Sequence, residues 1–400
     1  MKYIVVLGDG MADEPLKELD NKTPMMVADT PSIDLLALRS EVGLVHTIPE
    51  GMKPGSDTAN LAVLGYNPRK YYTGRSPLEA LSIGVDMKET DIALRCNLVS
   101  LSEDEVPYEK KTIIDHSSSE ISTEDATILM EAIKKEMDND IYRFFIGTSY
   151  RHLTIWDQGE VVDLAQPHDI LGRVIEEYLP QDIALKEMMR KSYEILNRHP
   201  INLKREAIGL NKANSLWFWG AGTRPSLTSF EEKNGKKGAM ISAVDLLKGI
   251  AIGAGMKVIE VPGADGTLHT NYEGKAIAAV KVLLEEDYDF VYVHVEAPDE
   301  MGHQGNIENK IKAIENLDQR VIKLLVEKME EAGAEYRMLI MPDHPTPIHC
   351  RTHTSDPVPY LLYDSTKEQK NSWKYDEADV KLSGNVIREG YTIISKLFHR

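Results

Sequence analysis

The sequence has only two cysteines, no long apolar run and no excess of positive charge, and each absence excludes a class of protein. Cys96 and Cys350 cannot build a disulfide framework, which agrees with a reducing compartment. The apolar runs are far shorter than the roughly 20 residues that cross a bilayer, so we expect no membrane segment. The apolar N-terminus is interrupted by Gly8-Asp9-Gly10, too early for a signal peptide. We therefore expect a cytoplasmic protein that begins with a buried strand.

The charge balance is acidic, with 64 acidic against 46 basic residues and a formal net charge of −18. Binding along a phosphate backbone needs a basic patch, so nucleic acid is not an expected partner. A small anionic substrate is compatible with this balance, because a few Arg and Lys side chains in one cleft can reverse the local potential. The charge leaves the number of subunits open.

The length of 400 residues exceeds the size of one usual hydrophobic core, which favours two domains. Short β-branched runs alternate with longer amphipathic stretches, and this alternation is typical of βα units around a parallel sheet. The clearest helix is expected over residues 307–333, where apolar residues recur at three- and four-residue spacing and Gly333 can end the helix. Another helix is expected over 241–252, followed by a strand over 257–261.

The stretch from residue 91 to residue 197 has a different pattern, which predicts a domain inserted into the α/β core. Strands are expected over 96–101, 144–146 and 151–156. Ser122 begins a helix N-terminus signature ahead of the helical stretch 126–137. The expected domains are a discontinuous core, residues 1–90 and 198–400, and an inserted domain, residues 91–197. No change in composition marks these borders.

Three apolar runs end in side chains that can bind metal ions. The runs are residues 3–7, 290–295 and 338–341. The side chains that follow them are Asp9, Asp299, His303, Asp343 and His344. An open parallel sheet binds its ligands at the carboxyl ends of its strands, so these side chains are expected to converge. Carboxylates and imidazoles at three strand ends predict a metal site with two ions.

Each of these residues has an ordinary structural alternative. Asp299 and His303 are four residues apart, so a helical turn would place both on one face, but a capping Asp and a surface His fit the same spacing. Asp343 and His344 are flanked by prolines, and a turn there can point both side chains the same way. His353 follows in the same proline-rich stretch, where a surface turn with incidental histidines is the alternative.

A candidate nucleophile, Ser56, lies in the small-residue turn 55–60, ahead of the helical stretch 61–64. Backbone N–H groups at a helix N-terminus stabilise a phosphate, and a nearby metal ion can make a hydroxyl nucleophilic at neutral pH. An ordinary N-cap serine is the alternative. The coincidence of four such features at strand ends and turns favours a metal site with a nucleophile.

Taken together, Ser56 and the metal-binding residues resemble the signature of the alkaline phosphatase superfamily. The nearest resemblance is to the cofactor-independent (2,3-bisphosphoglycerate-independent) phosphoglycerate mutases of the shorter archaeal type. Further segments that resemble this family are 30–37, 150–152, 167–169 and 238–242. The resemblance covers nearly the whole chain. It implies an alkaline-phosphatase-like α/β core, with a mainly parallel sheet between helices, and a smaller inserted α+β domain.

The resemblance also implies how the ligands divide. One ion would be held by Asp299, His303 and His353, and the second by Asp9, Asp343, His344 and Ser56. The ions would be divalent, most often Mn²⁺, with Zn²⁺, Co²⁺ or Mg²⁺ in some members, and no 2,3-bisphosphoglycerate would be needed. In the family, the serine takes the phosphoryl group of 3-phosphoglycerate, and the 2-hydroxyl of the glycerate then recovers it. The implied enzyme is an isomerase of glycolysis and gluconeogenesis.

A small phosphorylated substrate needs cationic partners, and Arg suits carboxylate and phosphate because its guanidinium binds in a bidentate way. The candidates are first Arg151, His168 and Asp169 of the inserted domain, then Arg95, Arg224 and Lys237, for which a solvated surface charge is the alternative. The inserted domain would close over the core and exclude water, which favours transfer over hydrolysis. A kinase of another small hydroxy acid such as homoserine, and a phosphomonoesterase, are the alternative functions.

Overall fold

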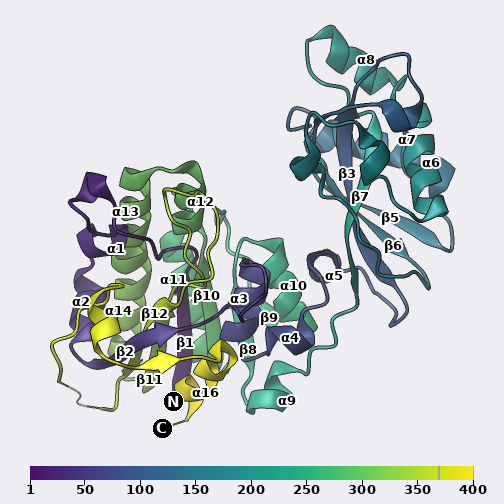
Figure 1. The fold of residues 1–400 in the computed structure, drawn as a ribbon. Coiled ribbons are helices and arrows are strands. Elements are labelled where there is room, and N and C mark those ends of the chain that lie inside the picture. Colours follow the sequence, from purple (N-terminus) through teal and green to yellow (C-terminus); the bar gives the residue numbers. More distant parts are fainter. Residues whose placement is uncertain (368–369, 400) are drawn as a thin grey trace. The chain divides into compact units, whose positions relative to one another are not determined.

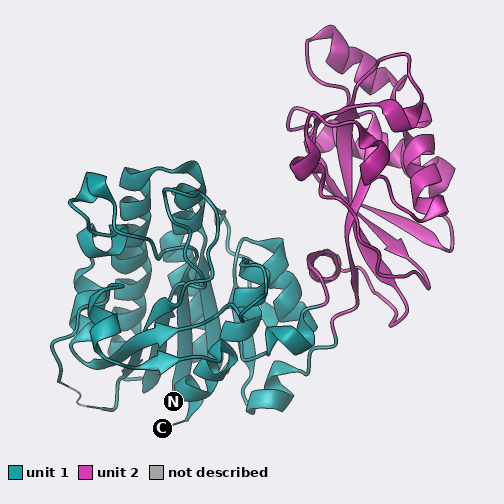
Figure 2. Cartoon of the chain, in the orientation of Figure 1, with its two compact units in different colours: residues 1–72, 226–400 teal, residues 73–225 magenta. Residues whose placement is uncertain are grey.

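The computed structural model describes residues 1–367 and 370–399, and the chain forms two compact units (Figure 2). The first unit comprises Met1–Tyr72 and Ser226–Arg400, and the second comprises Thr73–Pro225. Each unit has its own sheet and its own buried apolar core.

The second unit is larger than the expected insertion at residues 91–197, so both expected borders are corrected. It also contains α5 (Arg75–Ser82) and β7 (Ser215–Thr223). Strand β7 pairs antiparallel with β3 (Ile92–Leu101), and α5 packs on both strands. These are contacts between segments far apart in the sequence, which a local pattern of polar and apolar residues does not reveal.

The first unit is built on an eight-stranded sheet in the order β13-β2-β12-β11-β1-β10-β8-β9 (Figure 1). Its strands are β1 (Lys2–Gly8), β2 (Ser40–Val45), β8 (Gly238–Ile241), β9 (Lys257–Val258), β10 (Phe290–Val295), β11 (Tyr336–Met341), β12 (Val358–Asp364) and β13 (Val386–Ile387). Strand β1 lies between β11 and β10 and is parallel to both. These three strands are almost wholly buried, which explains their continuous apolar runs.

Helices pack against this sheet, with α11 on β10 and α16 on β11. The helices of the first unit are α1 (Pro24–Val27), α2 (Pro31–Ala37), α3 (Ser56–Val63), α4 (Pro68–Tyr71), α9 (Phe230–Asn234), α10 (Asp245–Gly253), α11 (Tyr272–Leu284), α12 (Ala297–Gln304), α13 (Ile307–Asn316), α14 (Lys323–Glu331), α15 (Asp379–Leu382) and α16 (Ile393–Phe398), with 3-10 turns at Lys17–Leu19 and Gly390–Thr392. Over the residues described, every helix is too short or too polar to cross a bilayer.

Three expected elements of the first unit differ from the structure in detail. The helix expected from residue 241 begins at Asp245, because Ile241 is still part of β8 and pairs with β10. The strand expected over 257–261 is only the two-residue β9. The helix expected over 307–333 is helical to Glu331 but contains a π-helical segment, Leu317–Ile322, and Gly333 follows its end at φ +61°.

The second unit has an antiparallel sheet in the order β4-β3-β6-β5, with β7 on β3. Its elements are β4 (Ile113–Asp115), β5 (Tyr142–Thr148), β6 (Arg151–Trp156), α6 (Thr123–Met137), α7 (Ile183–Leu196) and α8 (Pro200–Ala207), with 3-10 turns at Tyr108–Lys110, Pro167–Ile170 and Ile175–Tyr178. The three expected strands lie within β3, β5 and β6, and the side chain of Ser122 caps α6 by accepting from the backbone N–H of Asp125. Apolar residues of α6 and α7 form a core with this sheet.

The order of the strands in the first unit determines where the site lies. Parallel pairing brings the ends of β11, β1 and β10 to one edge, with Gly8 opposite Val295 and Leu7 opposite Met341. Asp9 and Asp343 follow two of these strands, and Asp299 lies in α12, which follows the third. The expected convergence of the three strand ends is therefore present.

Candidate metal centre

Asp299 gathers two imidazoles around its carboxylate. Asp299 and His303 lie one turn apart on α12, and Nε2 of His303 is 3.2 Å from Oδ2 of Asp299. Nε2 of His353 is 3.4 Å from the other oxygen, Oδ1, and 3.0 Å from Nε2 of His303. Nδ1 of His303 donates to the carbonyl of Arg351, which can only accept, so Nε2 faces Asp299 and His353. The structure thus brings together the three residues expected to hold one ion.

A second group forms around His344. Nε2 of His344 lies 3.5 Å from Oδ1 of Asp9, 3.4 Å from Oδ2 of Asp343 and 3.1 Å from Oγ of Ser56. Asp343 and His344 are fully buried. Ser56 was expected in a turn ahead of the helix, but it is the first residue of α3, directly after Gly55. These four residues are the set expected to hold the second ion.

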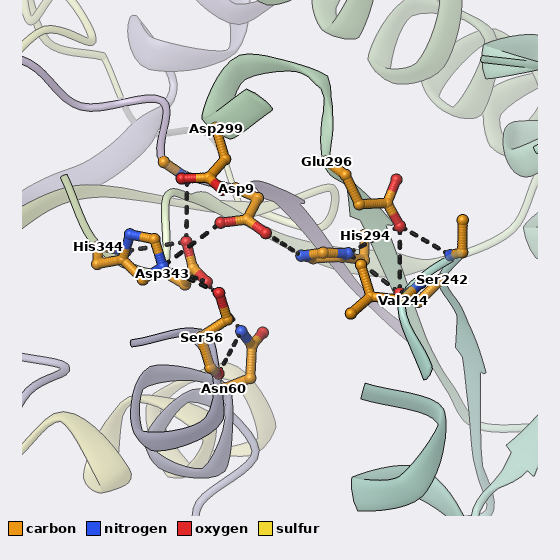
Figure 3. A network of polar contacts seen from close by, with 12 residues as sticks. Asp9, Ser56, Asn60, Ser242, Val244, His294, Glu296, Asp299, Asp343 and His344 are labelled. Atoms are coloured by element: carbon orange, nitrogen blue, oxygen red, sulfur yellow. Dashed lines mark hydrogen bonds and ion pairs between the residues drawn. The ribbon is translucent and has the colours of Figure 1, made fainter. Parts of the chain in front are cut away.

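The two groups are contiguous, and Figure 3 shows Asp299 of the first group with Asp9, Asp343 and His344 of the second. Ligand atoms of Asp299, His344 and His353 all lie within 4.8 Å of one another, so His344 also neighbours the first group. The close approach requires glycine at position 10, where φ is +58° and a Cβ would collide with Asp299. The backbone N–H of Gly10 donates to Oδ1 of Asp343 at 3.1 Å. The loop after β1 therefore connects both groups.

Asp343 is held by a residue that the sequence analysis did not single out. The side-chain amide of Asn60, on α3, donates to Oδ2 of Asp343 and to the backbone carbonyl of Ser56, both at 2.8 Å. Both acceptors lack a hydrogen, so the amide nitrogen faces them and the amide oxygen accepts from Tyr292 of β10. Asn60 therefore fixes the start of α3 against a candidate metal-binding carboxylate.

Burial and charge perturb these groups strongly. Burial raises the pKa of Asp9 well above its usual value, and the nearby charges of Asp343 and Asp299 raise it further. Burial would also raise the pKa of Asp299, but hydrogen bonds from His303 and His353 hold that pKa well below its usual value. The hydrogen bond to Asp299 raises the pKa of His303 to about 9.

This chemistry fits divalent cations. The carboxylates of Asp343 and Asp299 lie close enough to Asp9 to raise its pKa, and Oδ1 of Asp9 is buried without a hydrogen-bond partner among the described residues. A buried unpaired carboxylate oxygen is costly unless a cation binds it. The donors are oxygen and imidazole atoms without thiolate, a set that suits Mn²⁺ and is also compatible with Zn²⁺.

Comparison with known proteins assigns the chain to a family. A sequence model of the 2,3-bisphosphoglycerate-independent phosphoglycerate mutases matches residues 37–202. A probable 2,3-bisphosphoglycerate-independent phosphoglycerate mutase of Geobacter sulfurreducens is 47% identical and covers 100% of both chains. The corresponding mutase of Methanosarcina barkeri is also 47% identical, over 95% of both chains. The chain belongs to this family.

Solved structures agree with the assignment to this mutase family. A protein from Pyrococcus horikoshii aligns with a TM-score of 0.81 and 31% identity, over 99% of this chain and 96% of that chain. The cofactor-independent phosphoglycerate mutase of Thermoplasma acidophilum aligns with a TM-score of 0.68 and 26% identity, over 99% of both. The expected fold class, an α/β core with a mainly parallel sheet and a smaller α+β part, is confirmed.

In this member of the mutase family, most of the expected substrate-binding residues meet in the second unit. Rings of Tyr150, His116, His168 and Trp219 lie in successive contact, with centroid separations of 5.8, 6.1 and 5.6 Å. The guanidinium of Arg95 lies over Trp219 and that of Arg151 over Tyr150, while Asp169 is 3.7 Å from His168. We call these seven residues the second-unit cluster. Its aromatic members His116 and Trp219 were not expected from the sequence.

Cations of the second-unit cluster differ in their freedom to bind an anion. Arg151 is exposed, and no ion pair of its guanidinium is recorded among the residues described. Arg95 is mostly buried and forms a bidentate ion pair with Glu79. Arg151 is therefore the member best placed to take a substrate anion.

Two expected residues lie outside the second-unit cluster. Lys237 precedes β8, and its backbone hydrogen-bonds with Asp289 at the amino end of β10. The candidate metal-binding residues follow the carboxyl ends of the parallel strands, so Lys237 lies at the opposite edge of the sheet from them. Arg224 follows β7 and is exposed.

Proposed function

We propose that this protein interconverts 3-phosphoglycerate and 2-phosphoglycerate by metal-dependent phosphoryl transfer through a phosphoserine at Ser56. The observation that carries the proposal is the position of the Ser56 hydroxyl, 3.1 Å from Nε2 of His344, which also lies 3.4 Å from Asp343 and 3.5 Å from Asp9. Family membership supports the same reaction, since relatives aligned over nearly their whole length are named as these mutases. A cytoplasmic location, expected from the cysteine content, is part of the proposal.

Asp299, His303 and His353 would hold one divalent ion, and Asp9, Ser56, Asp343 and His344 would hold the other, with Mn²⁺ as the proposed ion. Bound there, the ions would supply charge stabilisation to the attacking and leaving oxygens of an in-line displacement. The residues of the chain place the hydroxyl of Ser56 at the start of α3, 3.1 Å from Nε2 of His344.

The proposed reaction has two transfers. In the first, Oγ of Ser56 bonds to phosphorus as the bond from phosphorus to the glycerate 3-oxygen breaks, and the serine proton passes to that oxygen. In the second, the glycerate 2-oxygen bonds to phosphorus, the bond to Oγ breaks, and the proton of the 2-hydroxyl returns to Ser56. The start of α3 suits this chemistry, because backbone N–H groups at a helix N-terminus favour phosphate.

The second unit is proposed to bind the charged groups of the substrate and to exclude water during transfer. The second-unit cluster supports this, because Arg151 is exposed and lies over Tyr150, one of the rings that can pack on a small substrate. Arg95 and Asp169 would position these groups, and Arg224 is a further candidate. Exclusion of water would favour return of the phosphoryl group to glycerate over hydrolysis.

One assay tests the proposed function. Purified protein with Mn²⁺ receives 3-phosphoglycerate, and 2-phosphoglycerate is followed through enolase. The expected result is mutase turnover that falls by a factor on the order of 10³ or more in Ser56→Ala, with Ser82→Ala on α5 as the control. Release of free phosphate as the main product would instead indicate a phosphomonoesterase. ATP-dependent phosphorylation of homoserine without mutase turnover would indicate the alternative kinase.

A further inference from the structure

One face of β10 carries two buried polar side chains in an otherwise apolar strand, Tyr292 and His294. They share this face because side chains alternate along a strand. Tyr292 reaches Asp343 through Asn60, as described above. His294 has no role in the two proposed transfer steps, yet it is fully buried and lies next to Asp9 (Figure 3).

The imidazole of His294 stands between two carboxylates. Its Nε2 is 3.0 Å from Oδ2 of Asp9, and its Nδ1 is 3.0 Å from Oε1 of Glu296. The hydroxyl of Ser242 lies 3.1 Å from the same Nδ1. Hydrogen-bond contacts at Nδ1 orient the ring, and Nε2 faces Asp9 in an ion-pair contact without a hydrogen-bond partner among the described residues.

Glu296 is itself fixed. Nζ of Lys275 is 2.5 Å from Oε2 of Glu296 and donates to the backbone carbonyl of His294 at 2.7 Å. The backbone N–H of Ala243 donates to Oε1 of Glu296 at 2.7 Å. Lys275 is fully buried and Glu296 nearly so, and their opposite charges compensate each other inside the core. The chain of contacts therefore runs from Lys275 through Glu296 and His294 to Asp9.

This chain of contacts has a consequence for the metal centre. It occupies Oδ2 of Asp9, while Oδ1 of the same carboxylate is buried without a hydrogen-bond partner in the described part of the chain. Oδ1 lies 3.5 Å from Nε2 of His344, on the side of the proposed second ion. With His294 at Oδ2, the carboxylate of Asp9 is held with its free oxygen directed at that ion.

We propose that His294 is a positioning residue for the second metal ion, oriented by Glu296 and Lys275 and acting through Asp9. The inference rests on the proposed function, since it requires that Asp9 binds a metal. Partners behind a metal ligand fix its orientation, and their loss typically lowers metal affinity by about 10- to 100-fold.

The experiment measures Mn²⁺ binding, independently of turnover. Competition with a fluorescent chelator gives the affinity of each site, and elemental analysis gives the number of ions per chain. In His294→Leu, the affinity of one of the two ions should fall by about 10- to 100-fold while the other stays unchanged. Glu296→Gln, which keeps an acceptor for Nδ1 but removes the charge, should lower the same affinity by about tenfold. His294→Gln, which can again reach Oδ2 of Asp9, should recover part of the loss.

The matched control is His152→Gln, which alters a buried histidine of the second unit and should leave both affinities unchanged. Circular dichroism checks that each variant is folded. If His294→Leu does not fold, Glu296→Gln tests the positioning role in its place. If His294→Leu and Glu296→Gln each bind two ions with wild-type affinity, the positioning role is wrong, whereas the proposed function stands. A wild-type protein that binds no divalent ion would overturn the proposed function as well.

X-ray absorption of the Co²⁺-saturated protein separates positioning from direct ligation. His294 acting through Asp9 leaves the number of imidazole ligands the same in wild type and in His294→Leu. Loss of one imidazole in His294→Leu, with Glu296→Gln unchanged, would make His294 a ligand and overturn the proposal.

Discussion

The hydroxyl oxygen of Ser56 lies 3.1 Å from Nε2 of His344, although 288 positions separate the two residues in the sequence. Ser56 begins α3 and His344 follows β11, and the fold places the end of β11 next to the start of α3. Asn60, one turn further along α3, donates to Asp343, the residue before His344. The candidate nucleophile and the loop of candidate metal-binding residues are therefore fixed to each other by direct contacts.

Removing an imidazole from the first group should cost one metal ion. His353→Ala is expected to lower bound Mn²⁺ from about two ions toward one per chain, because His353 lies 3.4 Å from Asp299 and 3.0 Å from His303. Elemental analysis after dialysis measures this. The control is His349→Ala, an exposed histidine of the same loop that lies 3.5 Å from Glu14. Equal metal content in the two variants would contradict the assignment of His353.

Arg151 should contribute to substrate binding more than to the transfer step. Arg151→Ala is expected to raise KM for 3-phosphoglycerate about tenfold or more, with a smaller change in kcat, because one anionic group loses its bidentate partner. Arg151→Lys should recover only part of the loss, since an ammonium cannot bind in the same planar way. Arg190→Ala on α7, which removes an exposed Arg paired with Glu187, is the control. An unchanged KM in Arg151→Ala would remove this residue from the substrate site.

A buried ion pair beneath the metal centre should contribute to stability. Nζ of Lys310 is 2.7 Å from Oδ2 of Asp13 and also donates to the carbonyls of Ala12 and Thr346, so it joins the loops after β1 and β11. Lys310→Met leaves Asp13 buried and unpaired and should lower the free energy of unfolding by about 3–5 kcal/mol.

Lys312→Met on the same helix breaks only an exposed pair with Glu315 and should change the free energy of unfolding by about 0.5 kcal/mol or less. Urea unfolding of the two variants, each compared with wild type, measures the difference. Similar losses of unfolding free energy in both variants would show that the buried pair of Lys310 and Asp13 stabilises the fold no more than the exposed pair does.

Glu377 should make stability depend on pH. Burial raises its pKa from 4.5 to about 7, although Thr23 and the backbone of Asp13 donate to it. The folded state therefore binds the proton more tightly than the unfolded state. The stabilising contribution is full below about pH 4.5 and is lost as pH rises to about 7.

Glu377→Gln removes this titration. The difference in free energy of unfolding between variant and wild type should shift in favour of the variant by about 2–3 kcal/mol from pH 5 to pH 8. Urea unfolding at both values measures it. A difference that is the same at both pH values would show that Glu377 has an ordinary pKa.

Much of the fold and of the ligand set follows from local sequence. The runs that form β1, β10 and β11 are continuously apolar and long enough for a strand. This pattern predicts buried, neighbouring parallel strands. Prediction was weaker where an element depends on distant partners. Strand β7 belongs to the second unit because it pairs with β3, and β9 is short because only two of its residues pair with β8.

Local sequence is enough to predict which residues stand at the ends of the central strands, because a polar side chain that follows a buried parallel strand emerges at its carboxyl edge. Asp9, Asp299 and Asp343 were predictable for that reason. The residues that lie behind them depend on how the chain folds. His294 lies inside a strand, and its neighbours across the sheet and from α11 determine whether it is a core side chain or a support for Asp9. Contacts made across the fold leave no spacing in the sequence from which they can be inferred.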